Sequence, residues 1–169
     1  MSIQDLHIIF TGGTIEKLYD PSLEANVMPD QSGIPAFLDK VIKPHFSYTH
    51  ETLCMLDSNE ITPDLRAELG VRIQSAESQN ILLVHGTSKM VETQDDLKEK
   101  LKGNKTVILT GAMIPLDGFY PTDSGFNLGF ALAGFRLLDP GIYIAMNGRF
   151  FKPGTVMKNV PKARFENAR

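Results

Sequence analysis

The chain has 169 residues, 42% of them hydrophobic, and this length is typical of one domain that buries roughly 70% of its unfolded surface. Its 17 basic and 20 acidic side chains give a net charge of −3 without a long basic block, which excludes nucleic acid as an expected partner. The single cysteine, Cys54, cannot form a disulfide within the chain, and this favours a reducing compartment.

No segment of the chain predicts a membrane protein. The first seven residues carry no basic segment ahead of their apolar run, and no stretch approaches the ~18 apolar residues of a membrane helix. We therefore expect a cytoplasmic protein without a membrane partner, in which residues 1–169 form one domain.

Four short apolar runs, rich in β-branched and aromatic residues, predict strands at 6–10, 81–84, 106–109 and 142–146. Residues 49–56 are a candidate fifth strand. Each of the four runs is almost continuously apolar, as in parallel strands that are covered on both faces, and each leads into a polar turn that contains glycine.

Helical patterns lie between these runs. Thr62 and Pro63 open an amphipathic helix that extends to position 76, and we expect further helices over 91–101 and, much more apolar, over 126–138. The alternation predicts an α/β fold: a three-layer, open, mostly parallel sheet with helices on both faces, flavodoxin-like or Rossmann-like. Residues 17–33 have no clean period and contain prolines and a glycine, so we expect a mobile flap there.

Small and hydroxylic residues follow the carboxyl ends of the predicted strands, at 11–14, 57–60, 85–89 and 110–113. Ligands bind outside these ends in an open α/β sheet. Glycines let backbone N–H groups approach a reacting carbonyl oxygen, and Thr or Ser hydroxyls attack once a base takes their proton, so the composition favours acyl transfer. Glycine-rich phosphate motifs and metal-ligand histidine spacings are absent, so we expect no cofactor and no metal.

Taken together, the motifs resemble the L-asparaginase family, specifically its larger N-terminal domain. The resemblance covers nearly the whole chain and rests on Thr11-Gly12-Gly13-Thr14, Asp57-Ser58-Asn59-Glu60, His85-Gly86-Thr87, Thr110-Gly111-Ala112-Met113, Phe126-Asn127-Leu128 and Met146-Asn147-Gly148. It implies an amidohydrolase that converts L-asparagine, or a related small amide, to the acid and ammonia without a cofactor.

The resemblance also implies residue roles. Thr14 would be the nucleophile, Thr87 and Lys158 the second catalytic group, and Tyr19 the flap tyrosine that closes on Thr14. For Lys158, the alternative is a surface lysine in a basic tail. The resemblance implies Ser58, Asn59 and Ala112 as substrate-binding residues, and we add Gly13, Asp57, Glu60 and Ser88 as further candidates. Among them, Gly13 and Ala112 would supply backbone donors or contacts, and the pair at 58 and 59 would face the α-carboxylate and α-amino end of the substrate.

One departure from the family leaves the reaction open. Ser88, followed by Lys89, stands where the family has an aspartate that pairs with the substrate ammonium. Losing that charge-assisted hydrogen bond removes roughly 1.5–3 kcal/mol, on the order of one to two powers of ten in binding or rate. Asp57 or Glu60 is a candidate replacement. The alternatives are an amino-acid-binding or regulatory protein with little turnover, or an amidase for a substrate without an α-amino group.

A second departure concerns length. Full-length members carry a smaller C-terminal domain with an acidic residue of the site, whereas this sequence ends at Arg169, soon after Lys158. The alternatives are a short form, whose site is closed by its own flap and by symmetric association, and a fragment, and we favour the short form. The apolar surface of the helix expected at 126–138 predicts a homodimer or homotetramer.

Overall fold

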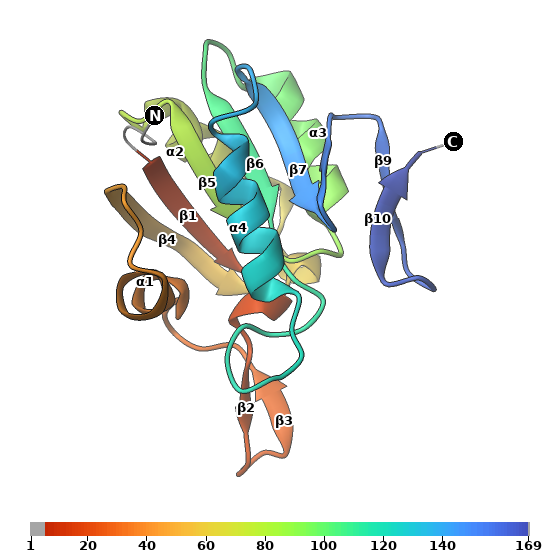
Figure 1. The fold of residues 1–169 in the computed structure, drawn as a ribbon. Coiled ribbons are helices and arrows are strands. Elements are labelled where there is room, and N and C mark those ends of the chain that lie inside the picture. Colours follow the sequence, from red (N-terminus) through yellow and green to blue (C-terminus); the bar gives the residue numbers. More distant parts are fainter. Residues whose placement is uncertain (1–5, 169) are drawn as a thin grey trace.

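Six strands form one central sheet in the computed structural model, which describes residues 6–168 (Figure 1). In spatial order they are β4 (Tyr48–Leu56), β1 (Leu6–Gly12), β5 (Asn80–Val84), β6 (Thr106–Thr110), β7 (Gly141–Met146) and β8 (Arg149–Phe151). The first five are parallel, and β8 pairs antiparallel with β7 at the edge. Numbered in chain order, the parallel strands run 2-1-3-4-5, which is the flavodoxin-like arrangement. The predicted strands, the candidate fifth included, are confirmed.

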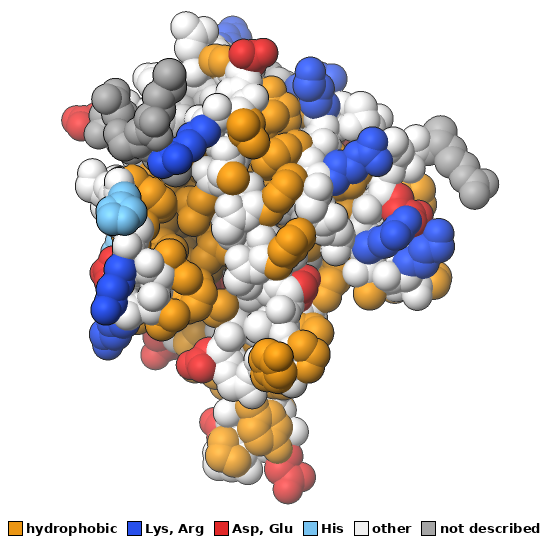
Figure 2. Space-filling view, in the orientation of Figure 1, with side chains coloured by type: hydrophobic (Ala, Val, Ile, Leu, Met, Phe, Trp, Pro, Cys, Tyr) orange, Lys and Arg blue, Asp and Glu red, His pale blue; other side chains and the backbone are white. Residues whose placement is uncertain are grey.

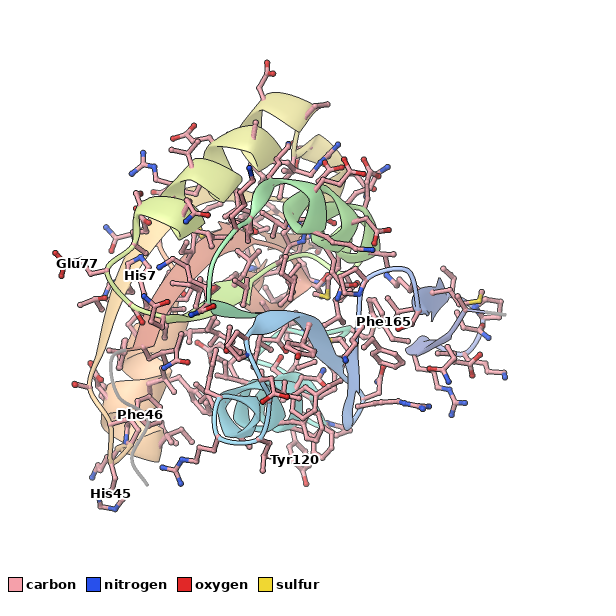
Figure 3. The ribbon with its side chains drawn as sticks, turned by 90° about the horizontal axis from the view of Figure 1, so that it is seen from above. His7, His45, Phe46, Glu77, Tyr120 and Phe165 are labelled. Atoms are coloured by element: carbon pink, nitrogen blue, oxygen red, sulfur yellow. The ribbon has the colours of Figure 1, made fainter. Side chains whose placement is uncertain are left out.

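Helices cover both faces of the sheet, which confirms the three-layer α/β prediction (Figure 3). One face carries α2 (Pro63–Ser75) and α3 (Met90–Lys100), and the other carries α4 (Ser124–Gly134) and α1 (Ile34–Phe37), which continues into a π-helical turn at Leu38–Ile42. Successive β1 side chains alternate between the two layers: Ile8 and Phe10 pack with α4, and Ile9 packs with α2 and α3. This alternation explains why the strand is apolar at every position.

The helices expected over 62–76 and 91–101 correspond closely at both ends to α2 and α3. The Thr62 hydroxyl accepts a hydrogen bond from Leu65 N at 3.3 Å, which caps α2 as expected. The helix α4 ends at Gly134, four residues before the predicted end, because the chain continues in a tight turn closed by hydrogen bonds from Leu137 N and Leu138 N to the Gly134 carbonyl. Apolar residues persist through this turn, so periodicity alone predicts a helix end that is too late.

Among residues 6–168, no helix is long and apolar enough to cross a membrane.

Two antiparallel ribbons extend from the sheet (Figure 1). Within the flap, β2 (Leu18–Asp20) pairs with β3 (Ala25–Val27), and near the C-terminus β9 (Val156–Asn159) pairs with β10 (Arg164–Asn167). The sequence predicted neither ribbon. Phe165 points from β10 toward the body of the protein, where it is 3% exposed and packs in the same core layer as α3 (Figure 3). The segment that carries Lys158 is therefore docked on the sheet domain.

Candidate active site

Glycines bring three of the predicted strand-end segments into direct contact. Gly13, with φ of 90°, follows β1 and donates its N–H to the Leu56 carbonyl at 2.9 Å. A Cβ atom on Gly13 would lie 2.4 Å from Cα of Gly86, and one on Gly86 would lie 2.7 Å from Cβ of Ser58. Side chains of any size would separate these loops. The contact lies at the carboxyl ends of β1 and β5, where the order of the parallel strands reverses and where such sheets bind ligands.

Thr14 and Thr87 each follow one of the two touching glycines. Thr14 begins a 3₁₀ turn (Thr14–Glu16), and its side chain is half-buried. Within residues 6–168 no hydrogen bond engages the Thr14 hydroxyl, which leaves its oxygen available to a ligand. Thr87 is 5% exposed. The two hydroxylic residues therefore lie on adjacent loops of the same edge of the sheet.

Lys158 reaches Thr87 from β9. Its Nζ lies 2.8 Å from Oγ1 of Thr87, so the ammonium donates to the hydroxyl. Burial lowers the pKa of Lys158, and the negative charge of Asp57 acts in the opposite direction. A lysine whose pKa is lowered is more readily neutral, and a neutral Nζ can accept the Thr87 proton. Here Lys158 is directed at the predicted site rather than lying in a solvated tail.

Asp57 is the carboxylate that acts on Lys158, and its own environment keeps it ionised. It caps the 3₁₀ turn Ser58–Glu60: Oδ1 accepts from Asn59 N at 3.1 Å and from Asn59 Nδ2 at 3.0 Å, while Lys17 Nζ lies 3.2 Å from Oδ2. The bond from Asn59 N, together with Lys17, lowers the pKa of Asp57. Glu60 instead completes the cap by accepting from Asp57 N at 3.0 Å.

The other predicted substrate residues occupy different environments. Ser58 is 2% exposed, and its Oγ accepts from Lys89 N at 3.2 Å. Ser88 is exposed in the turn that precedes α3, and Lys89 Nζ pairs with Glu92 of α3 at 2.7 Å. Ala112 is 1% exposed and its side chain packs in the core, so the side chain is not available to a ligand.

Hydrogen bonds close the base of the flap, whereas the Tyr19 side chain, farther out in the flap, is exposed. Glu16, 4% exposed, accepts hydrogen bonds from Ser32 Oγ at 2.7 Å and Gly33 N at 3.1 Å, which closes the loop between them. Burial raises the pKa of Glu16. Tyr19 lies in β2 and is 54% exposed, and no hydrogen bond among residues 6–168 joins it to Thr14.

Two asparagines that the sequence left without a role link the site to the C-terminal ribbon. Asn127 Nδ2 donates to the Gly111 carbonyl at 3.1 Å, and its Oδ1 accepts from Asn147 N at 3.0 Å. Asn147 Oδ1 in turn accepts from Phe165 N at 2.9 Å. This chain of bonds fixes β10, and so the ribbon that carries Lys158, against the loop after β6. A polar residue inside the apolar helix pattern was the available signal for Asn127.

His85 serves the backbone of the site rather than a ligand. It is fully buried, with Nδ1 2.7 Å from the Gly86 carbonyl and Nε2 3.0 Å from the Thr93 hydroxyl. A carbonyl can only accept, so Nδ1 carries the hydrogen and Nε2 accepts from Thr93. Burial lowers the pKa of His85 to about 4, which keeps it neutral.

Across residues 6–168 there is no group of three His, Cys, Asp or Glu side chains that could hold a metal.

The family described as "Asparaginase, N-terminal" matches residues 5–165. The chain is similar to L-asparaginase 2 of Escherichia coli (strain K12): the alignment of 154 positions has 25% identity and covers 87% of this chain and 44% of that protein.

Two solved structures share the fold. The thermostable L-asparaginase from Thermococcus kodakarensis superimposes with a TM-score of 0.84 at 24% identity, covering 97% of this chain and 51% of that one. The probable cytoplasmic L-asparaginase from Campylobacter jejuni gives a TM-score of 0.81 at 24% identity, covering 97% and 53%. The chain thus spans about half the length of these relatives. Because the family match extends over almost all of its residues, the chain belongs to the asparaginase family, through the N-terminal domain of that family.

Proposed function

We propose that this chain is an amidohydrolase of the L-asparaginase type, which hydrolyses L-asparagine or a related small amide to the acid and ammonia. The observation that carries the proposal is the 2.8 Å contact between Lys158 Nζ and Thr87 Oγ1, beside the glycine contact that sets Thr14 on the adjacent loop. Membership of the family supports the same reaction class.

In the proposed reaction, Thr14 Oγ attacks the carbonyl carbon of the substrate amide and loses its proton. Thr87 and Lys158 relay protons, so that the amide nitrogen leaves as ammonia and an ester to Thr14 remains. The N–H of Gly13 is bonded to the Leu56 carbonyl, so the oxyanion is held beside it by the N–H of Thr14, together with the N–H of Ala112. Water then attacks the ester carbon, the acid is released and Thr14 regains its proton.

Asp57 is the proposed partner of a substrate ammonium in place of the missing family aspartate. Its carboxylate is held ionised, whereas Glu60 is committed to the backbone cap. Lys17 already occupies Asp57 Oδ2, so a substrate ammonium must share Asp57 with it. This competition, together with Ser88, is the observation that favours an amide without an α-amino group as a second candidate substrate.

Ammonia release from asparagine, glutamine and succinamate, the asparagine analogue without an α-amino group, tests the proposal. Thr14→Ala is expected to abolish turnover, while Thr52→Ala, at an exposed threonine of β4, leaves it unchanged. A faster reaction with succinamate than with asparagine assigns the second substrate class. A folded protein that releases ammonia from none of the three refutes the enzyme, and a thermal shift with aspartate then identifies a binding protein.

We also propose a cytoplasmic location and self-association. The free thiol of Cys54 and the similarity to a protein named as a probable cytoplasmic L-asparaginase support the cytoplasmic location.

The surface of α4 supports self-association. Apolar side chains line this helix in Figure 2, and Phe126, 62% exposed, stacks on Phe130 with ring centroids 6.3 Å apart. Sedimentation is expected to show a dimer or tetramer of this chain, and a monomer alone at micromolar concentration contradicts that expectation.

A further inference from the structure

A cavity of about 330 Å³ lies at the end of the sheet opposite the candidate active site. It is bounded by the amino ends of β6 and β7, the last turn of α3 and the segment that joins β8 to β9, at the top of Figure 1. Apolar side chains form much of its lining: Leu101, Val107, Pro140, Ile142 and Pro153. Its volume falls at the lower end of the range found for small-molecule sites.

The charged side chains that line this cavity are all lysines, and the nearest carboxylates, Asp139 and Asp95, lie outside the lining. The lining includes Lys98, Lys102, Lys105 and Lys152, and it includes no aspartate or glutamate, although acidic residues outnumber basic ones in the chain. None of the four forms an ion pair with an acidic side chain of residues 6–168. Figure 2 shows Lys and Arg side chains at this upper end of the molecule, with an acidic side chain between them.

The four lysine side chains differ in their hydrogen bonds and in their exposure. Lys105 Nζ donates to the Ala76 and Ser78 carbonyls at 2.6 Å each, and these two residues lie outside the lining, so its ammonium is already engaged there. The side chains of Lys98, Lys102 and Lys152 are exposed and can turn toward a ligand. Like charges that converge without a counter-charge repel one another, and an anion between them removes that repulsion.

We infer that this cavity binds an organic anion, a carboxylate or a phosphate monoester carried on a small apolar group. The ammonium groups would meet the anion and the apolar lining would bury the rest of the ligand. This site is distinct from the proposed active site, because Thr14 and Thr87 lie at the carboxyl ends of the strands, whereas the cavity lies at the amino ends of β6 and β7.

Calorimetric titration of the full chain with phenyl phosphate and with benzoate tests the inference. The double variant Lys102→Gln/Lys152→Gln removes two mobile charges from the cavity. The matched control Lys40→Gln/Lys100→Gln removes two exposed charges elsewhere, and Lys100 lies on the same helix, α3, as Lys98. We expect at least about a tenfold weaker Kd in the cavity variant for the anion that binds, and an unchanged Kd in the control.

Two further probes separate the parts of the ligand. Phenol, which lacks the anion, is expected not to bind, and inorganic phosphate, which lacks the ring, is expected to bind at least about tenfold more weakly than phenyl phosphate. Absence of binding by both aromatic anions up to about 10 mM, or equal losses in the two double variants, overturns the inference. The readout requires no turnover, so its failure is distinguishable from failure of the amidohydrolase proposal.

Discussion

Nζ of Lys158 lies 2.8 Å from Oγ1 of Thr87, although the two residues are 71 positions apart in the sequence. The contact joins the C-terminal ribbon to the loop after β5. The Thr87 hydroxyl faces Met113 Sδ on its other side, at 3.8 Å, so the lysine is its strong hydrogen-bond partner. The two side chains therefore form a unit that should act together in catalysis.

A double-mutant cycle on this pair tests the unit. Thr87→Val and Lys158→Met are each expected to lower kcat by about 10²–10⁴, the usual contribution of a positioned proton-transfer group. Because either change breaks the same relay, the double variant should be little slower than the slower single variant. Lys162→Met, at an exposed lysine of the same ribbon, is the control and should retain full activity. Losses that multiply in the double variant would show two independent roles.

Asp57→Asn should move the pH dependence of turnover to lower pH. Burial lowers the pKa of Lys158, and the Asp57 charge opposes that effect. Removing the charge lets the pKa of Lys158 fall further, so neutral lysine, the proposed base, becomes available at lower pH. The asparagine side chain still has an oxygen that can accept from Asn59 N, so the turn is expected to persist.

The rising limb of kcat against pH measures this shift. Asp64→Asn is the matched control, because it removes one exposed carboxylate from the first turn of α2. A limb that moves to higher pH in Asp57→Asn, or an equal shift in both variants, would show that Lys158 is not the titrating base.

The sheet and its helices could be predicted because their signals are local. Strands β1, β5 and β6 are buried on both faces, so each is a short apolar run, and Thr62 with Pro63 marks the start of α2 by its own chemistry. The two ribbons could not be predicted in this way. Their strands are three or four residues long and half-exposed, so neither an apolar run nor a clear alternation identifies them.

The candidate site was predictable only in part, for the same reason. The segments at the ends of β1 and β5 are adjacent in any parallel sheet of this order, so the closeness of Thr14 and Thr87 follows from the fold. The position of Lys158 depends on Phe165 and on Asn147, whose contacts join residues 18 positions apart. No local pattern encodes such a contact, and only the family resemblance indicated a role for the lysine.

Gly86→Ala tests whether the loop contact is required. The φ of Gly86 lies outside the left-handed region, so alanine strains the site only through its Cβ, which would lie 2.7 Å from Cβ and Oγ of Ser58. We expect Ser58 to shift, with a loss of stability of about 1–3 kcal/mol by overpacking and a marked loss of turnover. Gly129→Ala is the control, since its Cβ meets nothing within 4 Å and alanine should stabilise α4 by about 0.5–1 kcal/mol. Thermal unfolding and ammonia release measure both variants, and an active, stable Gly86→Ala protein would mean that the loops can separate freely.

His85 should make the protein less stable as the pH falls below neutrality. Burial holds the pKa of His85 at about 4, against an ordinary value of 6.5, so the unfolded chain binds the proton more tightly than the folded one. The contribution of neutral His85 to the free energy of unfolding is complete above about pH 6.5. It is lost progressively as the pH falls to about 4, a change of about 3 kcal/mol. Glu16 acts in the opposite sense: its pKa is raised by burial, so its contribution is complete below 4.5 and is lost as the pH rises through its folded pKa.

Urea unfolding between about pH 7 and about pH 4 separates the two effects, because His85→Gln removes only the histidine. The free energy of unfolding of this variant is expected to be lower at neutral pH, since the bonds to Gly86 and Thr93 are disturbed, but to fall less with acid than that of the wild type. His45→Gln, at an exposed histidine labelled at the edge of Figure 3, is the control and should follow the wild-type curve. Parallel curves for His85→Gln and the wild type would mean that the proton is taken up elsewhere, and that His85 can be charged inside the fold.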